Sequence, residues 1–169
     1  GTVYAFQGLF REAEPVFAAG LKLAPNDSDL VASMRQVRHS QAQDLMDAQK
    51  YEEAIAFYTD LVKAEPTDPD LQTGLADAYF KRAQKKEGDA RKPDFKAAGD
   101  GYAKAGQLKA GNADLPFNAA LAYQSAGEYT LAEGQWRATL KIRPDDLDAM
   151  SALGATLAEL KKYDQGIQV

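Results

Sequence analysis

His39 is the chain's only histidine, and it is the first residue to test for chemistry because imidazole is a common metal ligand and general base. A metal site would need further ligands of suitable type, and a hydrolytic triad would need a serine or cysteine held beside the ring. The chain contains no cysteine, and Asp47 lies two turns along the same expected helix, too far for a close pair. We interpret His39 as a solvated histidine on a groove or surface.

Three carboxylate pairs could in principle perform acid–base chemistry, which requires burial in a fixed cleft that separates their pKa values. They fall where helices are expected to begin, and negative charge is favoured there by the helix dipole. We interpret them as structural, and expect no catalytic residue, no metal ligand and no cofactor. The pairs are Glu52 and Glu53, Asp68 and Asp70, and Asp145 and Asp146.

A basic run between Lys81 and Lys92 resembles a nucleic-acid patch, but Glu87 and Asp89 interrupt it and no aromatic residue interleaves it. The net charge of −5 also argues against a general nucleic-acid binder, which needs a basic face. We interpret the run as a solvated loop, with contact to an acidic partner as the alternative. No apolar run approaches the ~20 residues that span a bilayer, so no membrane insertion is expected. The compartment stays open, with the cytoplasm slightly favoured.

Four segments of the chain carry the same residues in the same order, anchored on Pro25, Pro66 and Pro144, with Ala110 in the fourth proline's place. An alanine precedes each anchor by twelve residues and an aromatic ring precedes it by eight. The alanines are Ala13, Ala54, Ala98 and Ala132, and the rings are Phe17, Tyr58, Tyr102 and Trp136. A small residue lets two helices cross closely, and a ring fills the wedge between neighbouring helix pairs. Gly8 and Gly127 precede the first and last anchors by seventeen residues and suit a turn with positive φ.

This pattern resembles the tetratricopeptide repeat over nearly the whole chain. The resemblance implies an all-α fold, an α-α superhelix in which antiparallel helix pairs form a right-handed solenoid. We expect a single array with units at about 1–27 (incomplete), 28–68, 69–112, 113–146 and 147–169 (incomplete). The expected helices are Thr2–Gln7, Phe10–Leu23, Ser28–Ala48, Tyr51–Ala64, Pro69–Lys86, Asp94–Leu108, Asp114–Ala126, Tyr129–Ile142, Leu147–Leu160 and a segment from Tyr163.

Two anchor spacings exceed the family period of about 34 residues. The first, from Pro25 to Pro66, is 41 residues, and the excess of two helical turns predicts one long helix from Ser28. The second, from Pro66 to Ala110, is 44 residues, which predicts a helix extended to about Lys86 and then a loop around Gly88 and Pro93. The following helix contains Gly99, Gly101 and Gly106, which suit either a soft helix or close approach of another backbone. Simple tolerance of these glycines is the alternative.

In the family, the first helix of each pair lines a concave groove that binds segments of partner proteins. The resemblance therefore implies a non-catalytic scaffold or adaptor whose partner has apolar anchors and some positive charge, because acidic residues outnumber basic ones along the stripe. The alternative is that the stripe's aromatic rings pack against adjacent helices. The groove residues carried over are His39, Ser40, Gln43, Asp47, Asp70, Thr73, Asp77, Phe80, Lys81, Asp114, Phe117, Asn118, Leu121, Gln124 and Asp148.

Some family members hold the terminal carboxylate of chaperone tails with a set of lysine, arginine and asparagine side chains. The matching positions here are Thr73, Asp77, Asn118, Asp148 and Ala152, of which only Asn118 fits. Aspartates in place of cations would repel the carboxylate, so we expect no such clamp.

Two other functions stay open. Both ends stop inside a repeat, so the chain could self-assemble through apolar helix faces. These faces would carry Val3, Tyr4 and Phe6 at one end and Leu157, Leu160 and Ile167 at the other. The chain could also be the regulatory arm of a larger enzyme.

Overall fold

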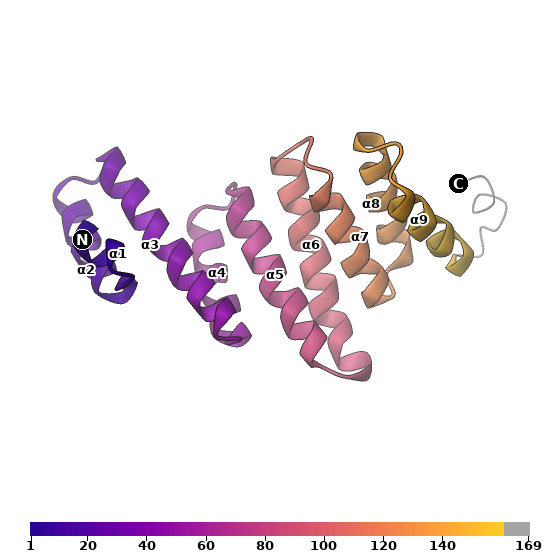
Figure 1. Ribbon diagram of the computed structural model, residues 1–169, viewed down its shortest axis with the longest axis horizontal. Helices are drawn as coiled ribbons and strands as arrows, with labels where there is room; N and C mark the ends of the chain where they lie inside the picture. The colour runs from indigo at the N-terminus through magenta and orange to yellow at the C-terminus, as the bar shows by residue number, and fades with distance from the viewer. Residues whose placement is uncertain (161–169) are drawn as a thin grey trace. The chain divides into compact units, whose positions relative to one another are not determined.

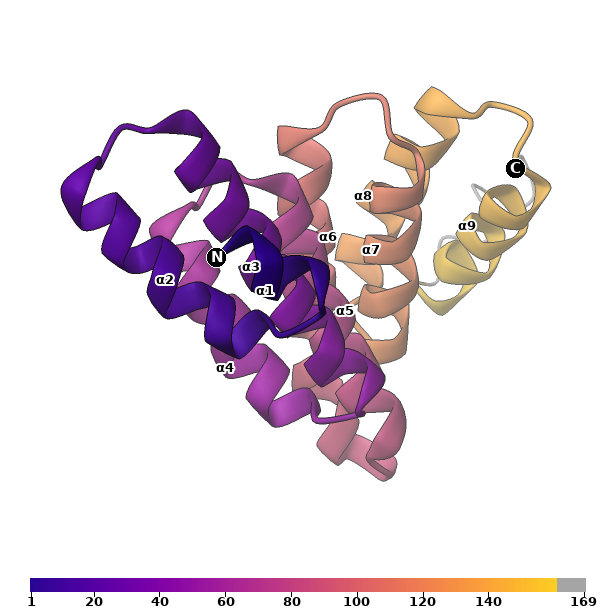
Figure 2. The same ribbon diagram turned by 60° about the vertical axis from the view of Figure 1, so that its left-hand side comes forward.

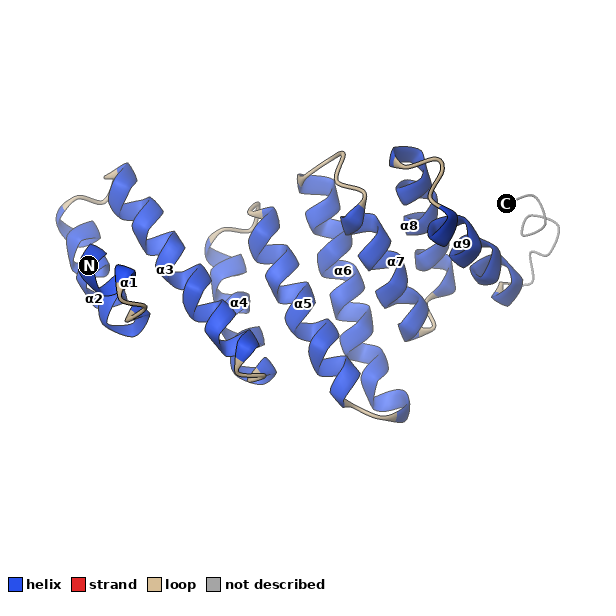
Figure 3. Ribbon diagram, viewed as in Figure 1, coloured by secondary structure: helices blue, strands red, loops and turns tan. Residues whose placement is uncertain are grey.

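The computed structural model describes residues 1–160, except the side chain of Phe6, and within these residues it contains helices and no strand (Figure 3). The chain divides into two compact units, residues 1–54 and residues 55–169, which are described separately. No helix in the described part is both long enough and apolar enough to cross a bilayer.

The first unit packs α1 (Thr2–Phe6) on α2 (Phe10–Leu23), and α2 on α3 (Ser28–Asp47). The apolar side of α2 faces that of α3 because its alanine and phenylalanine recur one helical turn apart. The core of the unit consists of Ala13, Phe17, Met34 and Val37.

Helix α4 (Tyr51–Ala64) crosses the boundary between the units, and further helices follow it in the second unit. They are α5 (Pro69–Lys85), α6 (Lys92–Leu108), α7 (Asp114–Ala126) and α8 (Tyr129–Ile142), and α9 (Leu147–Glu159) completes the unit. Each of these packs on the next one in the chain, so α5 to α9 lie side by side in sequence order in both views (Figures 1 and 2). The unit is therefore a row of consecutive helix hairpins.

The recurring small and aromatic residues are the buried ones, as the repeat pattern predicts. All four alanines that precede the anchors by twelve residues have no exposed surface. The rings that precede the anchors by eight residues are at most 5% exposed. Ala98, Tyr102, Ala132 and Trp136 belong to one core that also contains Leu153 and Leu157 of α9. The pattern that identifies the repeat is thus also the pattern that builds its core.

Three turns between the helices of a pair share one backbone motif. Gly8 and Gly127 have φ of 72° and 82°, and Gln49 occupies the matching position with φ of 56°. In each turn the next amide donates back to a carbonyl five residues earlier at 2.9 Å, as in Glu128 to Tyr123. This is the Schellman arrangement, which favours glycine at the left-handed position. The sequence predicted it at the two glycines, and the structure adds Gln49.

Three of the helices that follow the anchors begin with a side-chain cap two residues after the anchor, and at the fourth, α7, Asn112 in that place lies one residue before the N-cap Ala113. The carboxylates of Asp27 and Asp68 each accept from two backbone amides, and that of Asp146 accepts from the amide of Ala149. Asn112 accepts from the amide of Asp114 at 3.0 Å. Such caps satisfy amides that the first helical turn leaves without partners. The structural interpretation of Asp68 and Asp146 is therefore confirmed.

The predicted loop around Gly88 and Pro93 is mostly helix, which corrects the sequence interpretation of the 81–93 insertion. Helix α5 continues to Lys85, a short 3₁₀ helix η1 (Gly88–Arg91) follows, and α6 begins at Lys92. Pro93 lies in the first turn of α6, where its missing amide hydrogen costs nothing. The insertion thus lengthens both helices of the α5–α6 hairpin.

Two of the three glycines in α6 mark close contacts with other helices. A side chain at Gly99 would lie 2.6 Å from the ring of Tyr123, and one at Gly101 would lie 2.9 Å from the Cβ of Ala76. Gly106 has ordinary contacts, the nearest at 3.5 Å from the Cβ of Leu115. Close approach of another backbone therefore holds at Gly101, where backbone atoms of Ala76 and Gln72 lie at 3.4 Å, whereas Gly99 makes room for the Tyr123 ring.

Candidate functional site

The predicted groove residues of the second unit lie on the first helices of its pairs, α5, α7 and α9. On α7 they share one face because Asp114, Phe117, Leu121 and Gln124 are spaced at three or four residues. Leu121 is 38% exposed, whereas Phe117, Asn118 and Gln124 are half-buried. The amide oxygen of Gln124 is buried without a hydrogen-bond partner among the described residues. Helix α7 thus presents one exposed leucine between polar side chains.

The two predicted groove phenylalanines also take part in packing. Phe117 meets Trp136 of α8 edge to face at 5.1 Å between ring centres, and the guanidinium of Arg143 lies 5.7 Å from the centre of the Phe117 ring. Phe80 meets Phe95 of α6 edge to face at 5.2 Å. Both rings remain half-buried rather than fully covered. They combine the packing role and the surface role that the sequence treated as alternatives.

Asp77 is the most unusual titratable group on α5. It is half-buried, and its carboxylate accepts a hydrogen bond from the hydroxyl of Tyr102 on α6. Burial raises the pKa of Asp77 above its usual range, although the Tyr102 bond and the charge of Lys81 act in the opposite direction. Burial and the neighbouring carboxylate raise the pKa of Tyr102 as well. The hydroxyl therefore stays protonated and donates to Asp77.

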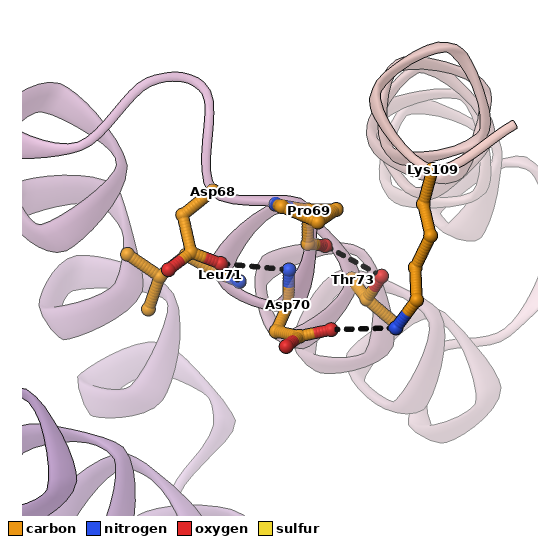
Figure 4. A network of polar contacts seen from close by, with 6 residues as sticks. All are labelled: Asp68, Pro69, Asp70, Leu71, Thr73 and Lys109. Carbon is orange, nitrogen blue, oxygen red and sulfur yellow. Dashed lines mark hydrogen bonds and ion pairs between the residues drawn. The ribbon is translucent and has the colours of Figure 1, made fainter.

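Asp70 and Asp114, predicted at the groove rim, are exposed, and each pairs with a cation that follows the second helix of its own hairpin. Lys109, directly after α6, approaches Asp70 at 3.5 Å between Nζ and Oδ1 (Figure 4). Arg143, directly after α8, approaches Asp114 at 3.1 Å. Beside the first pair, the Thr73 hydroxyl donates to the carbonyl of Pro69 at 2.8 Å (Figure 4). The rim is therefore less acidic than the sequence suggests, and Asp148 is exposed on α9.

In the first unit, the predicted residues His39, Gln43 and Asp47 lie on α3. The Gln43 amide donates to the carboxylate of Asp47 at 2.8 Å, and both side chains are exposed, while His39 is half-buried. Among the described residues no three histidine, aspartate or glutamate side chains gather as a metal site requires. The structure therefore places His39 on α3 near the polar side chains of Gln43 and Asp47 in sequence, half-buried and not part of a metal site.

A cleft of about 540 Å³ opens in the first unit between α3 and the two helices before it. Ser40, a predicted groove residue, contributes to it, whereas the remaining lining residues were not predicted as binding residues. The lining consists of Thr2, Ala5, Phe10, Phe17, Ala32, Ser33, Gln36 and Ser40. The available signal was the spacing of Ser33, Gln36 and Ser40, which puts them on one face of α3. The cleft itself depends on how α1 and α2 sit on that face, which spacing does not show.

The interpretation of the basic run changes with the structure. Arg82 binds Asp94 through two hydrogen bonds of 2.7 and 2.8 Å, and Lys86 binds the same carboxylate at 2.8 Å. Lys92 pairs with Asp89 at 2.8 Å. Part of the run therefore joins the last turn of α5 to the first turn of α6 instead of lying in a solvated loop.

One of the residues assigned to an open end is not available there. Leu157 has no exposed surface because it packs in the core with Trp136 and Leu153, and Leu160 is half-buried. Val3 and Tyr4 are 68% and 42% exposed. Ile167 and the expected helix from Tyr163 lie outside the described residues, as does the side chain of Phe6.

Comparison with known proteins places the chain among helical-repeat structures. The MamA structure "MamA AMB-1 P212121" superposes with a TM-score of 0.70 at 14% identity, covering 99% of this chain and 86% of that one. The Thermus thermophilus protein TTC0263, described as a thermophilic TPR protein, superposes with a TM-score of 0.55 at 21% identity, covering 99% and 82%. The first TPR of Spaghetti (RPAP3), bound to the HSP90 peptide SRMEEVD, has a TM-score of 0.54 at 22% identity, covering 79% and 92%.

These structural similarities support the fold. The family itself is shown by family models that match the sequence. No curated protein matches the chain. Two models described as tetratricopeptide repeat match residues 45–91 and residues 117–169, which together are more than half of the chain. With the buried alanines and rings in register and the hairpins stacked in order, the chain belongs to the tetratricopeptide-repeat family.

Proposed function

We propose that the chain is a protein–protein interaction scaffold that binds a partner segment along the first helices of its repeats. Tetratricopeptide-repeat proteins are in general non-catalytic interaction modules. The observation that carries the proposal is Leu121, exposed on the α7 face beside the half-buried Phe117 and Asn118. Leu121 and the Phe117 ring lie one helical turn apart and together form the apolar part of this face, on which we propose that an apolar anchor of the partner packs.

The partner is a segment with apolar anchors and some positive charge. Because Asp70 and Asp114 pair with Lys109 and Arg143, the preference for positive charge in the second unit rests on Asp77 and Asp148. The structural neighbour bound to an HSP90 peptide supports peptide binding by this fold. We propose no chaperone-tail clamp, because Thr73, Asp148 and Ala152 stand where that clamp has cations and the carboxylate of Asp77 stands where it has an asparagine.

The test is selection of peptides from a random display library on the purified chain, followed by affinity measurement for the enriched peptides. For peptides that bind the second unit, we expect Leu121→Asp to weaken binding at least tenfold, because it places a charge where the partner loses water. Leu131→Asp on α8 is the matched control, since Leu131 is similarly exposed at 41% but lies on a second helix. Equal affinities for the two variants, or no enrichment over bare support, would contradict the proposal.

A further inference from the structure

The cleft of the first unit has the size and lining of a side-chain pocket. Its volume of about 540 Å³ lies within the range of ~300–1,000 Å³ that ligand pockets occupy. Its apolar walls come from the rings of Phe10 and Phe17 and from Ala5 and Ala32. Phe17 is 5% exposed, so its ring is fixed by the core of the unit. The walls are therefore preformed rather than assembled by a ligand.

The polar part of the lining is uncharged. Thr2, Ser33, Gln36 and Ser40 supply hydroxyl and amide groups, and the residues that line the cleft include no acid or base. A charged side chain placed there would lose water without gaining a partner of opposite charge, which is costly. Hydroxyl and amide groups instead hydrogen-bond the backbone of a bound peptide. The chemistry of the lining selects an uncharged apolar side chain carried on a polypeptide.

The cleft continues along α3 into the stripe predicted to bind a partner. Gln36, Ser40, Gln43 and Asp47 are spaced at three or four residues and therefore share one face of the helix. From Gln36 to Asp47 this face runs about 16 Å, at ~1.5 Å per residue. A segment seated in the cleft and following this face would reach the C-terminal turn of α3.

That turn carries negative charge that the helix does not balance. Residues 44–47 include Asp44 and Asp47, both exposed, and no lysine or arginine. The C-terminal end of a helix is already the negative end of its dipole, so carboxylates there repel it and a cation is favoured. Lys50, which follows closely, pairs with Glu53 at 3.1 Å. The Gln43 amide holds the Asp47 carboxylate on the same face as the cleft.

We infer that the first unit binds a partner segment that places a large uncharged apolar side chain in the cleft and a lysine or arginine at Asp44 and Asp47. In an extended segment at ~3.3 Å per residue, these two side chains are about five residues apart. The inference rests on the proposed scaffold function and assigns it a specific partner chemistry and a second contact site, separate from Leu121.

The first arm of the test fills the cleft in the full chain. Ala32→Trp adds a ring at an exposed residue of the lining, and Ala19→Trp adds the same ring at an exposed residue of α2 outside the lining. The probes come from the peptides enriched on the unmodified chain, and those bound to the first unit are identified as the ones that Leu121→Asp does not weaken. We expect Ala32→Trp to weaken binding at least tenfold and Ala19→Trp to leave it unchanged. Gln36→Trp repeats the test if Ala32→Trp loses helical circular dichroism.

The second arm tests the charge. Enriched peptides should pair a leucine, methionine or aromatic residue with a lysine or arginine four to six residues away. Changing that basic residue to glutamine should weaken binding to the unmodified chain about tenfold, and should have little effect on the Asp44→Asn, Asp47→Asn double variant. Asp29→Asn, at the other end of α3, is the control and should behave as the unmodified chain.

The outcomes separate this inference from the scaffold function. If Leu121→Asp abolishes binding while Ala32→Trp and Ala19→Trp behave alike, the scaffold function stands and the cleft assignment is wrong. If the enriched peptides lack the basic residue, the charge assignment is wrong. It is also wrong if changing that residue to glutamine weakens binding equally for the unmodified chain and for the Asp44→Asn, Asp47→Asn double variant. If no peptide is enriched, both are contradicted.

Discussion

At the scale of single residues, Gln49 has the backbone conformation that glycine has at the two matching turns. Its φ of 56° compares with 72° at Gly8 and 82° at Gly127. A side chain in this region meets the backbone and costs ~1–2 kcal/mol relative to glycine. The hydrogen bond from the amide of Lys50 to the carbonyl of Leu45 nevertheless forms at 2.9 Å. The strain at Gln49 therefore comes from a side chain in the left-handed backbone region, and not from a missing hydrogen bond.

We predict that Gln49→Gly raises the free energy of unfolding by about 1 kcal/mol, because it removes the strain and keeps both turn hydrogen bonds. Part of the gain is offset by the greater freedom of glycine in the unfolded chain. Urea unfolding followed by circular dichroism measures the difference. Gln49→Ala keeps the strain and should not stabilise; a Gln49→Gly variant no more stable than Gln49→Ala would show that the turn is relaxed.

At the scale of helices, the repeat pattern predicted nearly every described element. Helices α2, α4, α7 and α8 have the predicted bounds, and α1, α3, α5 and α9 end one residue early. The reason is local: caps, alanines and rings stand at fixed distances from each anchor, and each acts within its own hairpin. The start of α6 was predicted two residues late because Pro93 was assigned to a loop, although proline is also common in the first turn of a helix.

The candidate site was less predictable than the helices. Helical spacing predicts which residues share the face of α7. It does not predict which cations pair with the rim carboxylates of Asp70 and Asp114. Lys109 follows Asp70 by 39 residues, whereas Arg143 follows Asp114 by only 29, because the intervening helices differ in length. The spacing between the two partners is therefore not constant, but their places relative to the anchors are. Each aspartate follows one anchor by four residues, and each cation directly precedes the next anchor. The cleft requires the packing of α1 and α2 on α3.

The Asp94 cluster gives the lengthened hairpin a dependence on pH. Burial acts to raise the pKa of Asp94, but hydrogen bonds and charges from Arg82 and Lys86 outweigh it and hold the pKa below its usual range. A carboxyl whose pKa is lowered by folding stabilises the folded state above its unfolded value of ~3.9, and this contribution is lost as pH falls through the folded pKa. The raised pKa of Asp77 acts in the opposite direction, so variants must be compared with the unmodified chain.

We predict that Asp94→Asn lowers the free energy of unfolding by about 2 kcal/mol at pH 7, because two cations lose a buried carboxylate. The difference from the unmodified chain should shrink as pH falls from about 4, where the unfolded chain binds the proton, through the lower pKa of Asp94 in the folded state. Denaturant unfolding at a series of pH values measures it. Asp60→Asn breaks an exposed pair with Lys63 and is the control, with an expected effect of a few tenths of a kcal/mol. A difference independent of pH would rule out the ionic origin.

At the scale of the whole molecule, the chain contains separate buried cores. One lies in the first unit and includes Ala13 and Phe17, and the largest lies in the second unit around Tyr102 and Trp136. In repeat proteins each hairpin contacts mainly its neighbours, so stability is a sum of local terms and part of the chain can open while the rest stays folded. We propose that both units belong to one repeat array, and that damage to one core remains within its own unit.

Ala13→Leu tests this expectation, because a larger side chain in a fully buried position overpacks the first core at a cost of ~1–3 kcal/mol. Amide hydrogen exchange in α2 and α3 should become roughly tenfold faster for each ~1.4 kcal/mol lost, while exchange in α6 to α8 should stay unchanged. Ala19→Leu, exposed on the same helix, should leave both units protected. If exchange instead accelerated equally in both units, the chain would unfold as one cooperative body. A partner bound only to the first unit would then stabilise the whole array rather than its own hairpins.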